Sequence, residues 1–209
     1  MGSYYYLASQ LPYLIYGQTP PMSSAAFRDL AKSLLSGHDS ALLDLVNLDP
    51  QPQKAGDESP SYAEAVPASG SDFIDRWREW ERSLRLNMAR HRSIKTKREG
   101  AAPVEPPIYP ADAAAAAVKA VVATESPLEA EILIDKARWN AIEYLQGIDY
   151  FDRSTIYAYL LKLMILERRA SFKTEEGFAE YKSLYAFILD RVQEGRLPGQ
   201  DVSPMGEPK

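Results

Sequence analysis

The segment from Ile156 to Leu166 constrains the fold of this chain more than any other, because it is apolar on nearly every side and only Lys162 interrupts it. A membrane helix needs about 20 predominantly apolar residues, so this run is too short to cross a bilayer. A helix that is apolar all round must instead be covered by neighbours on every side. We therefore predict a central core helix, capped by Asp152 or Ser154 and ending at Arg169.

A second amphipathic pattern follows this segment closely. Thr174 is a suitable N-cap, and Glu175 and Glu176 favour the positive N-terminal end of a helix. The apolar stripe of this helix consists of Phe178, Tyr181, Leu184, Tyr185, Ile188 and Val192. The short link between the two patterns predicts an antiparallel helical hairpin from Asp152 to Gln193.

Helical patterns also occupy the first part of the chain. Ser23 or Ser24 can cap a helix with Gly37 at its end, and a shorter helix is expected over 40–46. The apolar face predicted for the first of these helices contains Phe27, Leu30 and Leu34. Before them, the apolar start of the chain predicts either a short strand or a single helical turn over Tyr4–Ala8.

Two further helices are expected in the second half of the chain. One begins near Ala111 and contains the small residues 113–117, which favour helix and allow close packing. The other opens with a capping box over 126–129, has proline at its first position and ends at Gly147. Its predicted buried side contains Leu128, Ile132, Trp139, Ile142 and Leu145.

The tryptophan-rich segment between these regions predicts the longest helix, from Ser71 to Arg98. Its apolar residues recur every three or four positions, and at 1.5 Å per residue it would be roughly 40 Å long. The stripe is formed by Phe73, Trp77, Trp80, Leu84 and Met88. Its C-terminal half is strongly basic, with Arg82, Arg85, Arg90, Arg92, Lys95, Lys97 and Arg98 facing few acids.

Proline-rich stretches on either side of this helix divide the chain, since proline excludes continuous helix or strand. The class expected is all-α, a helical bundle with proline-rich loops. The expected segments are an N-terminal helical part (1–48), a flexible linker (49–70), the long basic helix (71–99), a second proline-rich linker (100–110), a C-terminal helical bundle (111–194) and a disordered tail (195–209).

The sequence contains no recognisable catalytic centre. Cysteine is absent, and the two histidines, His38 and His91, have no metal-binding spacing. The glycines form no phosphate-binding loop and the serines form no nucleophile elbow. We therefore expect no enzyme, no cofactor and no metal. His38 is expected to be exposed and His91 partly covered. The absence of a secretory signal favours a cytoplasmic location without direct membrane insertion.

Two features are candidate contacts for a partner protein. Tyr4, Tyr5 and Tyr6 either pack on the core or anchor an interface, where tyrosine is favoured, and three consecutive side chains cannot all face one core. The basic half of the long helix is either a solvated helix end or a docking surface for an acidic partner. The candidate docking residues on this helix are Arg85, Arg90, Arg92, Lys95 and Lys97. Nucleic acid is not expected there, because no interleaved aromatic residues accompany these charges.

Three blocks of the chain resemble a bacterial family encoded beside subunits of V/A-type rotary ATPases, itself similar to the helical C/d subunit that caps the rotor. The first block comprises Tyr4, Tyr5, Tyr6, Leu7, Leu11, Pro12 and Leu14. The second comprises Trp77, Trp80, Leu84 and Arg85. The third comprises Phe151, Asp152, Ile156, Tyr159, Lys162, Leu163, Ile165, Leu166, Glu167 and Arg168.

This resemblance implies a non-enzymatic subunit that links the rotor ring to the central shaft through protein contacts, at the membrane only by way of the complex. The chain is considerably shorter than a C/d subunit, so the resemblance fits an assembly or accessory factor equally well. The competing hypothesis is a helical module that binds nucleic acid or another phosphate ligand through its basic helix.

Overall fold

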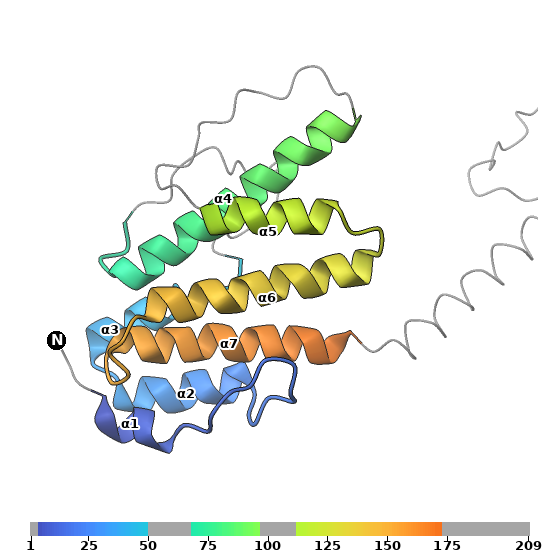
Figure 1. Cartoon of the computed structure of the whole chain (residues 1–209). Helices are drawn as coiled ribbons and strands as arrows, with labels where there is room; N and C mark the ends of the chain where they lie inside the picture. Colours follow the sequence, from blue (N-terminus) through green and yellow to red (C-terminus); the bar gives the residue numbers. More distant parts are fainter. Residues whose placement is uncertain (1–3, 50–67, 97–111, 173–209) are drawn as a thin grey trace, which may run out of the picture. The chain divides into compact units, whose positions relative to one another are not determined.

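The computed structural model describes residues 4–49, 68–96 and 112–172 (Figure 1). The chain divides into two compact units, Met1–Arg169 and Ala170–Lys209. Of the second unit, the described residues are 170–172. The predicted helix 174–193 and its hairpin, most of the two proline-rich linkers, and the tail lie outside the described residues and stay predictions.

The described residues contain seven α-helices and no β-strand, which confirms the all-α class. The helices are α1 (Tyr5–Gln10), α2 (Ser24–Leu34), α3 (Gly37–Leu43), α4 (Asp72–Thr96), α5 (Asp112–Val122), α6 (Pro127–Gln146) and α7 (Arg153–Ser171). Of the two alternatives for the start of the chain, the helix is the one found, and the possible N-terminal strand is wrong. Helix α1 buries Leu7 and leaves its polar residues outside.

Helix α2 begins as expected but faces the core differently. The Ser23 hydroxyl accepts a hydrogen bond from the Ala26 amide at 3.1 Å, which confirms the predicted cap. Phe27 and Ala31 are buried, whereas Leu30 and Leu34 are each 40% exposed. The predicted face is therefore confirmed at Phe27 and wrong at Leu30 and Leu34, because the small Ala31 lies against the core instead.

Two boundaries follow from local capping. Gly37 does not end α2 but begins α3, because the Ser36 hydroxyl accepts from the Asp39 amide at 3.2 Å and opens a new helix. Gly147, in contrast, ends α6 as predicted, and its φ of 74° is one that L side chains rarely adopt.

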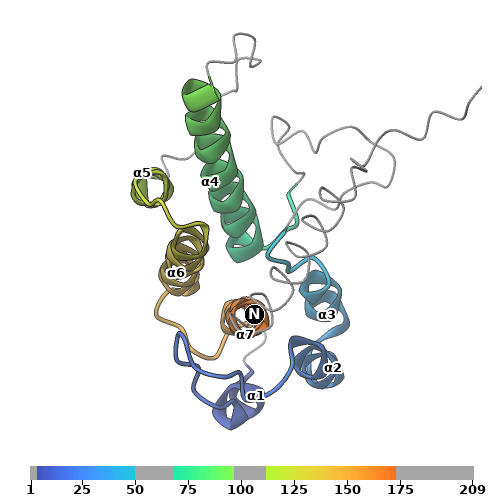
Figure 2. The ribbon, with the colours of Figure 1, turned by 90° about the vertical axis from the view of Figure 1, so that its right-hand side faces the viewer.

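Helix α7 lies at the centre of the first unit, with α1, α2, α3, α4 and α6 around it (Figure 2). Nine of its residues are buried: Ile156, Tyr157, Ala158, Tyr159, Leu160, Leu161, Leu163, Ile165 and Leu166. This confirms the prediction of a helix that is covered all round. Asp152 is its cap, since its Oδ1 accepts from the Thr155 amide at 3.0 Å.

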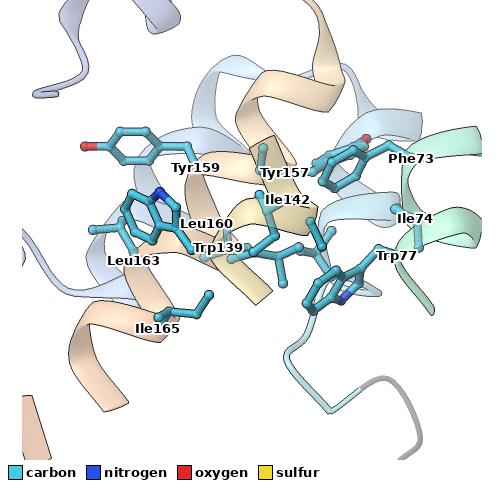
Figure 3. Close-up of a cluster of buried hydrophobic side chains, with 14 of the residues drawn as sticks. Phe73, Ile74, Trp77, Trp139, Ile142, Tyr157, Tyr159, Leu160, Leu163 and Ile165 are labelled. Atoms are coloured by element: carbon cyan, nitrogen blue, oxygen red, sulfur yellow. The ribbon is translucent and has the colours of Figure 1, made fainter. Parts of the chain in front are cut away.

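The core joins α4 and α6 to this central helix (Figure 3). Phe73 and Trp77 of α4 are buried with Ile142 of α6 and Tyr157 of α7, and the rings of Phe73 and Tyr157 are 6.4 Å apart. Lys162, the one polar interruption of the apolar run, lies with its Nζ 5.2 Å from the centre of the Trp139 ring. Burial lowers the pKa of Lys162, and the ion pair with Glu143 opposes this shift only in part.

Helix α6 presents an unexpected face to this core. Ser126 caps it as predicted, but Leu128 is exposed, while Ile134, Asp135, Arg138 and Ala141 are buried beside Trp139 and Ile142. The predicted buried side was therefore only partly right. Two charged side chains occupy core positions, and apolar periodicity cannot find such positions.

Candidate partner-binding site

The three N-terminal tyrosines point to different surroundings. Tyr4 is half-buried, and its hydroxyl donates to Asp39 Oδ2 at 2.5 Å. Tyr5 and Tyr6, on the first turn of α1, are 60% and 68% exposed. Tyr4 therefore joins the N-terminal end of α1 to Asp39 of α3, whereas Tyr5 and Tyr6 are exposed to solvent.

The start of α1 contacts a connection that carries further exposed apolar residues. The Tyr5 ring lies 4.4 Å from that of Phe151, and the Tyr4 amide donates to the Phe151 carbonyl at 2.7 Å. These contacts bring α1 to the connection between α6 and α7, as Figures 1 and 2 show. We call this region the aromatic surface, and it consists of Tyr5, Tyr6, Ile148, Tyr150 and Phe151.

Exposure of such residues is unusual for a connection between two helices. Ile148 is 94% exposed and Tyr150 is 63% exposed, although both are large and apolar. Folding alone would favour polar residues at these positions, since each apolar side chain left in water forgoes roughly 1.5–3 kcal/mol of burial. Clustered exposed apolar side chains mark interaction sites more often than scattered ones do.

The base of the aromatic surface is held by a polar cluster around Asp39. The Arg153 guanidinium donates to Asp39 Oδ1 at 3.2 Å, and the buried Tyr157 hydroxyl donates to the Asp39 carbonyl at 3.0 Å. Burial would raise the pKa of Asp39, but the hydrogen bonds from Tyr4, Arg153 and Ser36 outweigh it and lower the pKa below its ordinary value. Asp39 is therefore a satisfied carboxylate that ties α1, α3 and α7 together.

A pocket of about 440 Å³ adjoins this cluster. It is lined by the first turns of α3, α4 and α7, including the carboxylates Asp39, Asp72 and Asp152. Each helix N-terminus carries roughly half a positive charge, and each of these carboxylates lies at one of them. The charges of the pocket therefore largely compensate each other within the fold.

A second buried polar cluster, which we call the ionic cluster, joins α4, α6 and α7. Glu81 accepts from Arg138 Nη2 at 2.7 Å and from Arg138 Nε at 3.1 Å. Arg138 Nη1 donates to Asp135 Oδ1 at 3.1 Å, and Arg168 Nη1 lies 3.8 Å from the same oxygen. These residues position the helices, and Glu81, Asp135 and Arg138 are too deeply buried to bind a partner directly.

The predicted basic surface divides between this cluster and the exposed end of α4. Arg85 donates from Nε to Glu81 at 3.0 Å and lies 3.4 Å from Asp49, so it serves the fold. Arg90 and Arg92 are exposed, which fits a solvated helix end and a docking surface alike. Lys97 lies outside the described residues, as does the side chain of Lys95.

The histidines agree with the expectation from the sequence, since His38 is exposed and His91 half-buried. Among the described residues, no group of three or more His, Asp or Glu side chains is arranged to hold a metal ion. The same residues include no helix that is both long enough and apolar enough to span a membrane.

Sequence reasoning identified the three tyrosines but missed two parts of the site. Ile148 and Tyr150 follow Gly147 in a connection where apolar periodicity is absent, so no pattern marked them. The one indication in the sequence was that these residues are apolar, although a short connection between helices gives such side chains no core to pack against. No protein-family model, curated protein or solved structure matches this chain.

Proposed function

We propose that this chain is a non-enzymatic, protein-binding subunit or accessory factor of a V/A-type rotary ATPase. The observation that carries the protein-binding part is the aromatic surface. Tyrosine is among the residues that contribute most to binding energy at interfaces, because it buries a large ring and keeps a polar hydroxyl. Tyr5, Tyr6 and Tyr150 have that character and are mainly exposed.

The rigidity of its base supports the same proposal. A contact surface costs less to order when its backbone is already fixed before binding. Tyr4 and Arg153 both bind Asp39, and the Phe151 carbonyl accepts from the chain start, so the aromatic surface is tied to α3 and α7. An aromatic surface held in this way is pre-organised for a partner.

A second exposed surface suits a subunit that couples two partners. Arg90 and Arg92 lie on α4, whereas the aromatic surface is formed by α1 and the connection between α6 and α7. One surface is basic and the other is aromatic, so the two favour partners of different chemistry. Linking the rotor ring to the central shaft, or assisting the assembly of that joint, requires two such contacts.

The identity of the partner rests on the resemblance of the three sequence blocks. Most residues of the second and third blocks, such as Trp77, Leu84 and Ile156, are buried. These residues support the helical framework, while the first block contributes Tyr5 and Tyr6 to the exposed surface. The resemblance thus suggests a rotary ATPase as the partner, and the exposed residues suggest which surface would contact it.

Co-purification with the ATPase tests this proposal. A tagged full-length chain is expressed in its native host, the complex is isolated gently, and mass spectrometry measures the stoichiometry of rotor and shaft subunits. Recovery of these subunits at a fixed ratio is expected. Their absence, while the intact ATPase is present in the same extract, would contradict the proposal.

The basic surface has its own test within the same experiment. Replacing Arg90 and Arg92 by Glu should reduce co-purification, because both side chains are exposed and reversal of charge repels an acidic partner. Lys136→Glu, at an exposed cation of α6, is the matched control. If Lys136→Glu reduces recovery as much as the α4 variant does, the effect comes from net charge and the basic surface is not the contact.

The exposed arginines of α4 also favour a second candidate, a module that binds nucleic acid or another phosphate ligand. Counterion release makes such binding fall steeply with salt concentration. A titration of the full chain with labelled RNA and DNA at several salt concentrations separates the two candidates. Tight, salt-sensitive binding that Arg90→Glu abolishes would favour nucleic acid over a protein partner.

A further inference from the structure

The two chain segments that form the aromatic surface carry charges of one sign. Residues 4–16 contain no charged side chain, and residues 143–152 contain the acids Glu143, Asp149 and Asp152 but neither lysine nor arginine. Arg153, the first residue of α7, pairs with Asp39, and Lys162, farther along this helix, pairs with Glu143. The exposed Asp149 lies between Ile148 and Tyr150, and it forms no ion pair with the residues that the structure describes.

The direction of α6 adds to this negative potential. Helix α6 ends at Gln146, so its C-terminal end, which carries roughly half a negative charge, lies immediately before Ile148. No basic residue occupies its last turn to offset this charge. Because Asp152 lies at the positive N-terminal end of α7 and offsets it, the end of α6 and Asp149 together favour a cation over a phosphate group at this connection.

The aromatic rings favour the same kind of ligand. An arginine or lysine over the face of a tyrosine gains roughly 0.5–1 kcal/mol at an exposed site, and more where water is excluded. Tyr150 follows Asp149 in the chain, and Tyr5 lies against Phe151, whose amide donates to Asp149 Oδ1, so exposed rings lie close to this carboxylate. Ile148, almost fully exposed, offers an aliphatic contact next to them.

We infer that the aromatic surface binds a basic segment of a partner protein, in which an arginine or lysine lies against the tyrosine rings near Asp149 and an adjacent aliphatic side chain covers Ile148. This inference deepens the proposed function by giving the chemistry of the partner at this surface. The two exposed surfaces of the chain then select opposite partners, a basic one here and an acidic one at the end of α4.

A peptide-binding experiment with the full-length chain tests the charge of the partner. The probe is a fluorescein-labelled amphipathic peptide of leucine and arginine, and its counterparts carry Glu or Gln in place of each Arg. Fluorescence anisotropy should show the Arg peptide binding at least about tenfold more tightly than the Glu peptide, with affinity falling as salt rises. Equal affinities for the two peptides would overturn the inference.

Three variants locate the binding. Tyr5→Ser with Tyr150→Ser should weaken the Arg peptide about tenfold, the effect expected for interface aromatic anchors. Asp149→Asn should weaken it a few-fold and flatten the salt dependence. This change keeps the Oδ1 atom that accepts from the Phe151 amide at 3.0 Å, so the connection should be preserved. Ile94→Ser on α4, where Ile94 is 66% exposed, is the matched control and should leave binding unchanged.

The outcomes separate this inference from the proposed function. Binding of the Arg peptide at the tyrosines without co-purification of ATPase subunits would uphold the inference and contradict the partner identity. Co-purification that survives both Tyr5→Ser with Tyr150→Ser and Asp149→Asn would uphold the proposed function and overturn the inference. Binding of anionic vesicles through the same tyrosines would overturn the inference as well. Unchanged circular dichroism melting of each variant excludes unfolding as the cause of lost binding.

Discussion

Asp39 and Asp135 are both buried carboxylates, yet the protein treats them in opposite ways. Asp39 accepts hydrogen bonds on both oxygens, from Tyr4 and Arg153, and its pKa is lowered. Asp135 uses Oδ1 for Arg138, whereas its buried Oδ2 has no hydrogen-bond partner among the described residues. Burial raises the pKa of Asp135, and the attraction of Arg168 and Arg138 does not fully offset it.

The difference shows that burial alone does not determine what a charge contributes. A carboxylate whose hydrogen bonds replace those lost from water stabilises the fold as an anion. A carboxylate with one oxygen left unpartnered pays part of that desolvation cost uncompensated. Asp39 therefore supports the aromatic surface from below, while Asp135 is a weak point in the ionic cluster between α4, α6 and α7.

The largest effect is expected when the ionic cluster loses Glu81. Glu81→Gln removes the charge that binds Arg138 twice and Arg85 once, and leaves the buried Arg138 guanidinium dependent on Asp135. Removing one partner of a buried ion pair costs about 3–5 kcal/mol. We expect a loss in that range in the free energy of unfolding, measured by urea denaturation.

Asp72→Asn is the matched control for this change, because Asp72 and Arg76 form an exposed ion pair on the same helix. Such surface pairs contribute little, so the control should change stability by less than about 0.5 kcal/mol. A Glu81→Gln variant no less stable than the control would mean that the cluster does not hold α4 to α6.

The next largest effect is expected at Asp39. Asp39→Asn removes the ion pair with Arg153 and weakens the hydrogen bond from Tyr4, which together should cost about 1.5–3 kcal/mol near neutral pH. Because the pKa of Asp39 is lowered on folding, its carboxylate stabilises the folded state above the ordinary pKa of 3.8. That stability is lost as the pH falls through the folded-state pKa.

The gap between wild type and Asp39→Asn should therefore narrow in acid. Chemical denaturation at a series of pH values between neutrality and about pH 3 measures it. Asp149→Asn, at an exposed acid that keeps its local hydrogen bond, controls for the change in net charge. A gap that stays constant over this range would show that the charge of Asp39 is not what stabilises the fold.

A smaller effect is expected from Tyr4→Phe, which removes one hydroxyl and leaves the ring in place. The hydroxyl donates to Asp39 and accepts from the Ser36 amide at 3.3 Å, so its loss should cost about 1 kcal/mol. In a double-mutant cycle with Asp39→Asn the two losses should not add, because they share one hydrogen bond. Tyr6→Phe, at an exposed tyrosine, is the control and should leave stability unchanged. If the losses of Tyr4→Phe and Asp39→Asn add, the two residues do not act through a shared hydrogen bond.

The contrast between the two carboxylates also marks the limit of sequence reasoning. Apolar periodicity predicted the all-α class, the central helix α7 and the tryptophan face of α4, because these depend on burial of apolar area. The caps at Ser23 and Ser126 were predictable because they depend on neighbouring residues. Periodicity could not find Asp135 or Arg138, since their burial depends on Glu81, 57 residues away from Arg138 along the chain.

The candidate site divides in the same way. The tyrosine run was visible as composition, but which of its members faces inward depends on Asp39, a contact between Tyr4 and a residue 35 positions away. Ile148 and Tyr150 are assigned to the same site as Tyr5 because the Phe151 ring lies against Tyr5, a contact that the sequence does not predict. Local rules thus predict elements and caps, whereas long-range polar contacts and the grouping of exposed side chains require the fold.

The smallest effect, and the sharpest test of the comparison, is expected at Asp135. Asp135→Asn should change stability near neutral pH by no more than about 1 kcal/mol, because the loss of attraction to Arg138 and Arg168 is offset by relief from burying a charge with one unpartnered oxygen. Glu131 repels the same charge, and Arg138 remains paired with Glu81 in the variant.

The pH dependence at Asp135 should be opposite to that at Asp39. A carboxylate with a raised folded-state pKa takes up its proton more readily in the folded state than in the unfolded state, so the wild type gains stability as the pH falls through that pKa toward 3.8. Asp135→Asn cannot gain in this way and should lose ground to the wild type as the pH falls toward 3.8, whereas Asp39→Asn should recover as the pH falls below 3.8. Parallel curves for the two variants would mean that both carboxylates are equally well satisfied. Crossing curves would show that hydrogen-bond partners, and not depth of burial, determine what each contributes.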